Sequence, residues 1–198
     1  MRQGIKHLSH SNKKTQLTKH FDIHLHLVKE AQKGSNKAMS SLYQNYCDAM
    51  FNVAWRFLKN DFEAEEIVQE SFLSAFQKLH TFRNDTSFGA WLKRIVINKS
   101  LDHIKKKKLE TTELDEQLLD IPEEQDEREL PYSLEEVQKA IEALPEGYRI
   151  MVTLYLIEGY DHEEISQILN VKQSTTRTQY MRAKRKLRSL LQKEHHAR

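Results

Sequence analysis

The chain contains little glycine, proline or cysteine. Its 198 residues include five glycines, three prolines and one cysteine, Cys47. A β-sandwich or barrel requires many tight turns, and therefore many glycines and prolines, so the composition favours helices. A single cysteine excludes an intramolecular disulfide and a cysteine-based zinc site.

Long hydrophobic runs are also missing. No apolar stretch is long enough to cross a membrane as a helix. The first twenty residues are basic and polar and lack the apolar segment of a secretory signal peptide. We therefore expect a cytoplasmic protein with no membrane insertion.

The charges are segregated along the chain, although the net charge is only +2. Residues 61–70 hold five acidic residues and no basic one, and residues 109–131 hold ten acidic residues and one arginine. Residues 93–108 hold seven basic residues and one aspartate, and residues 172–193 hold eight basic residues and no acidic one. Two basic blocks on either side of an acidic one suggest two nucleic-acid contacts joined by a spacer. Solvated helix faces are the alternative reading of these blocks.

Apolar spacing and capping residues predict an all-α fold of two small helical domains joined by a flexible acidic linker. Helices are expected over 22–33, 36–58, 62–79, 88–106, 134–143, 146–157, 162–169 and 174–191. The expected organisation is a basic disordered tail (1–21), a first domain (22–106), the linker (107–131), a second domain (132–193) and a short tail (194–198).

The second domain carries a helix-turn-helix pattern. A capping box from Asp161 to Glu164 opens a short helix, and a four-residue turn (170–173) leads into a long basic helix. The N-terminal end of such a helix reaches base edges in the major groove, where arginine can bind guanine and glutamine can bind adenine. The side chains expected at the bases are those of Ser174, Thr175, Arg177, Thr178 and Gln179, with Arg182 further along the helix. A helical hairpin with a basic tail is the alternative.

The first domain combines rings, guanidinium groups and an amide at one loop–helix junction. These residues are Phe82, Arg83, Phe88, Trp91, Arg94 and Asn98. Unpaired bases stack on aromatic rings, with about 1–3 kcal/mol per base, so this junction could hold a strand of opened DNA. Most aromatic residues at helical spacing belong to the core, however, and Phe88 and Trp91 can be read that way too.

Taken together, these motifs resemble the extracytoplasmic-function (ECF) class of bacterial sigma factors. The resemblance covers about residues 22–192. Residues 61–72 are similar to the polymerase-binding helix of the family. Residues 88–102 are similar to its helix for the −10 promoter element, and residues 159–171 and 182–187 to its helix-turn-helix for the −35 element. It implies a four-helix sigma region 2 followed by a helix-turn-helix sigma region 4, and a role in transcription initiation.

The resemblance also implies partners and residue roles. Core RNA polymerase would bind through its clamp coiled coil to Glu66, Gln69 and Glu70, and through its flap to the C-terminal domain. The base flipped from the −10 non-template strand would lie beside Phe82, Arg83, Trp91, Arg94, Ile95 and Asn98. The −35 major groove would receive Ser174, Thr175, Arg177, Thr178, Gln179 and Arg182. An anti-sigma factor is a further expected partner, and no cofactor is expected.

The linker length agrees with this arrangement. Residues 109–131, fully extended, reach roughly 75 Å. Promoter elements of this class are about 17 base pairs apart, which corresponds to ~60 Å of duplex. The acidic linker could imitate nucleic acid inside the polymerase channel, or it could be a solvated spacer.

The chain departs from the family at the start of the recognition helix. It has Ser174-Thr175-Thr176 where many relatives have Gly-Thr-Val, and Gln179 where a basic residue is common. The promoter sequence therefore cannot be carried over from relatives.

Two rival functions explain less of the chain. A helix-turn-helix repressor or activator would account for 132–193 but not for the acidic helix or the aromatic–basic helix. For an enzyme, His162-Glu163-Glu164-Ile165-Ser166 begins like a zinc-protease helix, but serine stands where the second histidine ligand should be. We therefore expect no catalytic residue and no metal site.

Overall fold

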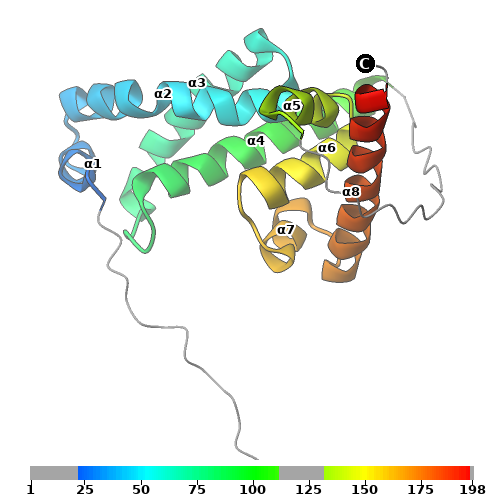
Figure 1. Cartoon of the computed structure of the whole chain (residues 1–198). Helices are drawn as coiled ribbons and strands as arrows, with labels where there is room; N and C mark the ends of the chain where they lie inside the picture. The colour runs from blue at the N-terminus through cyan, green and yellow to red at the C-terminus, as the bar shows by residue number, and fades with distance from the viewer. Residues whose placement is uncertain (1–21, 112–131, 197–198) are drawn as a thin grey trace, which may run out of the picture.

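The computed structural model describes residues 22–111 and 132–196 (Figure 1). The tail predicted at 1–21 lies outside the described residues, as does the linker from residue 112 onward. In the first module the chain forms α1 (Leu25–Gln32), α2 (Asn36–Leu58), α3 (Asp61–Gln77), a 3-10 turn (Leu79–Thr81) and α4 (Phe88–Thr111). In the C-terminal module it forms α5 (Leu134–Glu142), α6 (Glu146–Val152), a π-helical turn (Thr153–Ile157), α7 (His162–Leu169) and α8 (Gln173–His196). The predicted all-α fold is confirmed.

Polar caps define where several helices begin. The Ser35 hydroxyl accepts a hydrogen bond from the backbone N–H of Ala38, and the side-chain amide oxygen of Asn60 accepts one from the backbone N–H of Glu63 at 3.0 Å. The capping box predicted at Asp161–Glu164 is present, and a second capping box lies at Ser133–Glu136. These short-range bonds satisfy helix N–H groups that would otherwise have no partner, which is why they could be predicted from sequence.

The helix predicted over 88–106 continues to Thr111. The lysine run at its end pairs with acids on two other helices, because Lys107 Nζ lies 2.7 Å from Glu63 and Lys108 Nζ lies 2.9 Å from Glu146. Cations are also favourable near a helix C-terminus, where the macrodipole is negative. The five residues assigned from sequence to the start of the linker are thus helical.

Aromatic and aliphatic side chains from α2, α3 and α4 form the core of the first module. Phe57, Phe72, Phe88 and Leu92 are each at most 2% exposed. Three apolar residues of the C-terminal module, Met151, Leu154 and Ile165, belong to the same buried cluster. A smaller separate cluster, which includes Ala140, Ala183 and Leu187, joins α5, α6 and α8. The modules are therefore in contact, and Figure 1 shows α6 and α7 beside α4.

Gly89 allows α4 to approach α2 closely. A Cβ atom at this position would lie 2.8 Å from Cε1 of Tyr46. That ring is held in place, because the Tyr46 hydroxyl and Nδ1 of His24 form a 3.0 Å hydrogen bond and the ring meets Phe88 edge-on.

Gly89→Ala is therefore expected to destabilise the fold, although alanine favours helices by up to about 1 kcal/mol. The clash should outweigh that gain and cost about 1–3 kcal/mol. Urea unfolding followed by circular dichroism measures the change. Gly147→Ala is the matched control, because a Cβ there meets nothing within 4 Å. A Gly89→Ala variant as stable as that control would contradict this account of the contact.

Within the described ranges, no helix is both long enough and apolar enough to cross a membrane.

Candidate nucleic-acid interface

Three rings meet where the loop after α3 enters α4. The Trp91 ring centroid lies 5.3 Å from that of Phe82 and 5.9 Å from that of Phe88. Phe88 is fully buried and Phe82 is 8% exposed, whereas Trp91 is half-buried. Phe82 and Phe88 therefore support Trp91 from inside, and Trp91 is the ring that remains partly open to a ligand.

The start of α4 is fixed by a residue far away in sequence. The Asp22 carboxylate accepts a hydrogen bond of 2.6 Å from the backbone N–H of Phe88 and one of 2.9 Å from that of His24. The Ser87 hydroxyl accepts one from the backbone N–H of Ala90 at 3.2 Å. Together these bonds anchor the first turn of α4 and so position Trp91, one turn further on. Asp22 carries no local sequence signal for this role.

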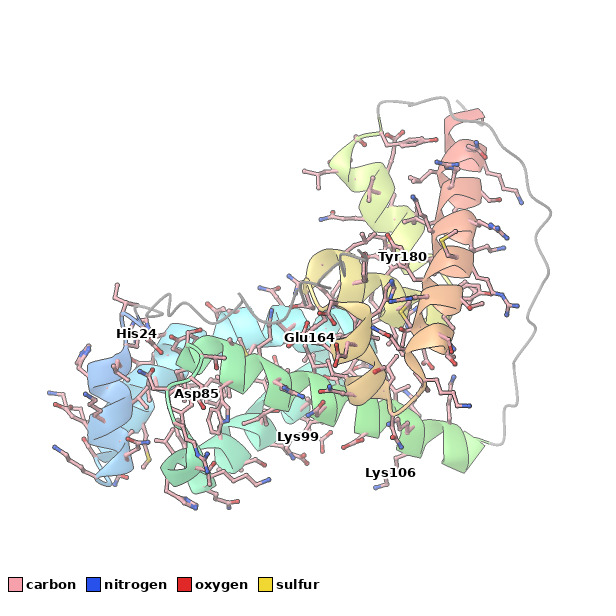
Figure 2. The ribbon with its side chains drawn as sticks, turned by 90° about the horizontal axis from the view of Figure 1, so that it is seen from below. His24, Asp85, Lys99, Lys106, Glu164 and Tyr180 are labelled. Atoms are coloured by element: carbon pink, nitrogen blue, oxygen red, sulfur yellow. The ribbon has the colours of Figure 1, made fainter. Side chains whose placement is uncertain are left out.

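The other residues predicted to contact the −10 element follow Trp91 along one side of α4. Arg94 and Asn98 are exposed and Ile95 is half-buried. Their spacing of three and four residues places Trp91, Ile95 and Asn98 above one another on the helix, with Arg94 beside them. Arg83 is exposed in the preceding loop. That loop, which also holds Asp85, lies at the end of α4 remote from α8 (Figure 2).

The exposed face of α3 is acidic with apolar flanks. Glu66 and Gln69 are both exposed, and Phe62 and Leu73, at the same helical spacing, are 77% and 64% exposed. Large exposed apolar side chains interleaved with polar ones are typical of a protein-binding surface. Of this surface, only the polar residues were predicted from sequence. Phe62 and Leu73 could have been found from their positions four residues from Glu66 and Gln69.

The third predicted polymerase-binding residue, Glu70, belongs to a groove between α3 and α4. Its carboxylate lies 3.1 Å from Lys99 Nζ. Acids of α3 and bases of α4 line this groove, and Figure 2 shows Lys99 and Lys106 along α4. Glu70 is therefore partly neutralised within the chain. Glu66 lines the same groove but is exposed, as is Gln69.

The helix-turn-helix of the C-terminal module is held by a buried threonine and an aromatic stack. The fully buried Thr176 hydroxyl shares its one proton between two carbonyl oxygens, that of His162 on α7 at 3.1 Å and that of Gln173 in its own helix at 2.8 Å. The His162 ring stacks on Tyr155 with centroids 4.7 Å apart, and Tyr155 lies 4.3 Å from Tyr180 of α8. These contacts fix the angle between α7 and the first turns of α8. Burial raises the pKa of Tyr180, with a further contribution from Tyr155.

The predicted base-reading residues lie on α8 on both sides of Thr176. Ser174, Arg177, Thr178 and Arg182 are exposed, and Thr175 and Gln179 are half-buried. The Thr178 hydroxyl donates to the carbonyl of Ser174 in its own helix. Arg177 and Arg182 therefore present the freest polar groups of the set on the outer side of α8.

A carboxylate that sequence analysis missed lies between the modules. Glu158, just after the π-helical turn, has a side chain only 5% exposed; its two oxygens lie 2.8 Å from Arg56 Nη1 on α2 and 3.1 Å from Lys93 Nζ on α4. Lys93 Nζ also lies 5.6 Å from the centroid of the Tyr160 ring. Burial raises the pKa of Tyr160; Glu158 raises it further, and nearby Arg94 opposes this.

Comparison with known proteins agrees with the two modules. The family model described as Sigma-70 region 2 matches residues 42–110, and the one described as Sigma-70, region 4 matches residues 134–187. The ECF RNA polymerase sigma factor SigW of Bacillus subtilis is 30% identical over 181 residues, 83% of this chain and 94% of SigW. The ECF RNA polymerase sigma factor SigE of Mycolicibacterium smegmatis is 32% identical over 168 residues, 81% of this chain and 65% of SigE.

Two solved structures have a similar fold. CnrH, solved in complex with the cytosolic domain of CnrY, matches with a TM-score of 0.52 and 25% identity over 84% of this chain and 95% of that one. The sigma factor RpoE of Bartonella quintana, solved in complex with the anti-sigma factor NepR, matches with a TM-score of 0.54 and 21% identity over 79% of this chain and 98% of that one. The chain belongs to the ECF family of RNA polymerase sigma factors, which act in transcription initiation. The family resemblance inferred from sequence is thus confirmed, and the repressor alternative is not supported.

Proposed function

We propose that this chain directs core RNA polymerase, in the cytoplasm, to promoters with two separate elements. The exposed face of α3 binds the polymerase clamp coiled coil. Trp91, Arg94 and Asn98 hold the opened non-template strand of the −10 element, and the N-terminal part of α8 reads the −35 element in the major groove. The C-terminal module also binds the polymerase flap.

The observation that carries this proposal is the half-buried Trp91 beside two exposed polar residues. A ring supported by Phe82 and Phe88 can stack on an unpaired base, and Arg94 and Asn98, one and two turns further along α4, can bond its edge and phosphate. The second DNA surface, on α8, has the geometry of duplex readers.

Transcription with purified core polymerase on genomic fragments, with and without this protein, tests the proposal. We expect discrete transcripts that depend on the protein. The absence of both new transcripts and a complex with core polymerase, with a folded protein, would rule it out.

An anti-sigma factor is the second proposed partner. Both similar solved structures contain a second chain, the cytosolic domain of CnrY in one and the anti-sigma factor NepR in the other. The exposed Leu156 and Ile157, which are 52% and 42% exposed at the edge of the C-terminal module, offer an apolar contact for such a chain.

Neutralising Glu66 is expected to weaken binding to core polymerase. An exposed carboxylate that meets a basic partner contributes about 0.2–1 kcal/mol, so Glu66→Gln should raise the dissociation constant roughly 1.5- to 5-fold. The loss should shrink as salt is raised, because exposed charges are screened. Fluorescence anisotropy of labelled protein titrated with core polymerase at several salt concentrations measures the dissociation constant and its dependence on salt. Glu30→Gln, an equal charge change at an exposed position of α1, should behave as wild type. Equal effects of the two substitutions would contradict a specific role for Glu66.

A further inference from the structure

An exposed loop before α4 lies between two anchored positions. Residues 83–86 are all exposed, whereas Phe82 on one side and Phe88 on the other are buried. Arg83 belongs to this loop, and Trp91 follows one turn beyond Phe88 on α4. The conformation of the loop and of the first turn of α4 therefore determines how these two side chains are presented to a strand of DNA.

Both anchors come from the segment that forms α1. At its beginning, the Asp22 carboxylate, which is 8% exposed, accepts the 2.6 Å hydrogen bond from the backbone N–H of Phe88. At its end, the side-chain amide of Gln32 donates to the carbonyl of Leu79 at 3.0 Å and to that of Phe82 at 3.3 Å. One short helix thus holds the chain immediately before the exposed loop and immediately after it.

The α1 segment is itself fixed to the core of the first module. Val28 and Ala31 are 1% and 2% exposed. The Asp22 carboxylate accepts a second hydrogen bond from the backbone N–H of His24, and a negative charge is favourable at the N-terminus of α4. Figure 2 shows His24 and Asp85 of the loop at the same end of the module. The anchors are therefore rigid relative to the loop that they hold.

We propose that Asp22 and Gln32 are positioning residues for the −10 strand, and that they hold residues 83–86 and the first turn of α4 in the conformation that accepts one particular base. This rests on the function proposed above. Neither side chain contacts DNA; each acts through the backbone groups that it bonds. A loop with both ends fixed loses less conformational freedom on binding, so its contacts form at a lower cost and tolerate fewer arrangements of the base. Both residues precede the range 42–110 that matches Sigma-70 region 2.

Base discrimination by core polymerase carrying this chain tests the proposal. The templates contain a promoter found in the transcription experiment, with its −10 region unpaired and each of the four bases placed at each unpaired position in turn. At the position of the captured base, the unaltered chain should favour one base by roughly 5- to 150-fold in transcript yield. A smaller fraction of folded protein lowers the yield on every template equally, so this ratio reports positioning and not folding.

Asp22→Ala removes both acceptor bonds and should lower the ratio at least about fivefold. Asp22→Asn keeps an acceptor oxygen without the charge, so it should retain part of the discrimination. Glu30→Gln makes the same charge change as Asp22→Asn at an exposed position of α1 and should leave the ratio unchanged.

Gln32→Met tests the other anchor with little risk to the fold, because Gln32 is exposed and both residue types favour helices. It removes the two donated hydrogen bonds and should lower the ratio about 2- to 10-fold. Gln44→Met, at an exposed position of α2, is the matched control and should discriminate as the unaltered chain does. Discrimination at the −35 positions should be unchanged in every variant.

The outcomes separate the two proposals. An unchanged −10 ratio in either Asp22→Ala or Gln32→Met would overturn the two-anchor proposal, as would an equal fall in yield for all four bases or an equal loss of discrimination at −35. Should Asp22→Ala not fold, Asp22→Asn takes its place in this comparison. Absence of any promoter-dependent transcript with the unaltered chain would instead overturn the proposed function, and the positioning role with it.

Discussion

Replacing Asn98 by alanine is expected to reduce promoter-dependent transcription by roughly 5- to 150-fold. Asn98 is exposed on α4, two turns beyond Trp91, and its amide can donate to and accept from one base edge. Loss of a two-bonded base contact costs about 1–3 kcal/mol, which gives that range. The fold should not suffer, because the side chain lies outside the core and alanine favours a helix more than asparagine does.

The template distinguishes strand reading from duplex binding. On a promoter whose −10 region is already unpaired, the Asn98→Ala defect should persist, because the contact to the opened strand is still missing. Binding to a −35 duplex should be unchanged. Asn52→Ala, the same substitution at an exposed position of α2, should transcribe as wild type. A defect that disappears on the unpaired template would show that Asn98 helps to open the duplex rather than to hold the strand.

Features determined within a few residues could be predicted from the sequence. The capping boxes at Ser133 and Asp161 define the starts of α5 and α7 through bonds to residues three positions away. The −5 block at 61–70 marks an exposed helix face because acids favour the first turns of a helix and remain solvated there. Recognition of the family then added roles that no local pattern shows.

Features determined by distant partners could not be predicted. Asp22 caps α4 from 66 residues away, and Glu158 pairs with Arg56 across 102 residues. In sequence each is one acid among many, and only the fold brings its partner near. The burial of the Phe82 ring against Phe88 and Trp91 likewise depends on how the loop folds back, and no pattern within the loop shows it. The place of Phe82 beside the flipped base stays a prediction.

The π-helical turn is a further example of a feature without a local signal. The predicted helix over 146–157 is continuous in sequence, but its last turn is π-helical, with the Glu158 N–H donating to the carbonyl of Thr153 at 2.9 Å. An inserted π-turn rotates the residues that follow it relative to an α-helix. That rotation contributes to the direction in which Glu158 points toward α2 and α4, so the inter-module contact depends on backbone geometry as well as on charge.

Arg177→Ala is expected to relax sequence preference in the −35 element. Arg177 is exposed one turn into α8, next to Thr176, whose buried hydroxyl fixes the recognition helix on α7. An arginine held rigidly there can form two bonds to one guanine, and removing it should cost about 1–3 kcal/mol at that base pair and little at others. Because residues 174–176 differ from those of many relatives, the preferred sequence is best defined by sequencing the promoter fragments bound by polymerase containing each variant.

The matched control is Arg188→Ala, which removes the same exposed charge further along α8. A residue at that position is expected to contact phosphates rather than bases. Its loss should therefore weaken binding equally for all sequences, and the slope of log binding constant against log salt concentration should fall by about one. Arg177→Ala should instead change the preferred sequence at one or two positions. A different outcome is that both variants weaken binding to all fragments equally, with no change in the preferred sequence. In that outcome Arg177 contacts only the DNA backbone, and the specificity of the −35 contact must come from Gln179 or the hydroxyl groups beside it.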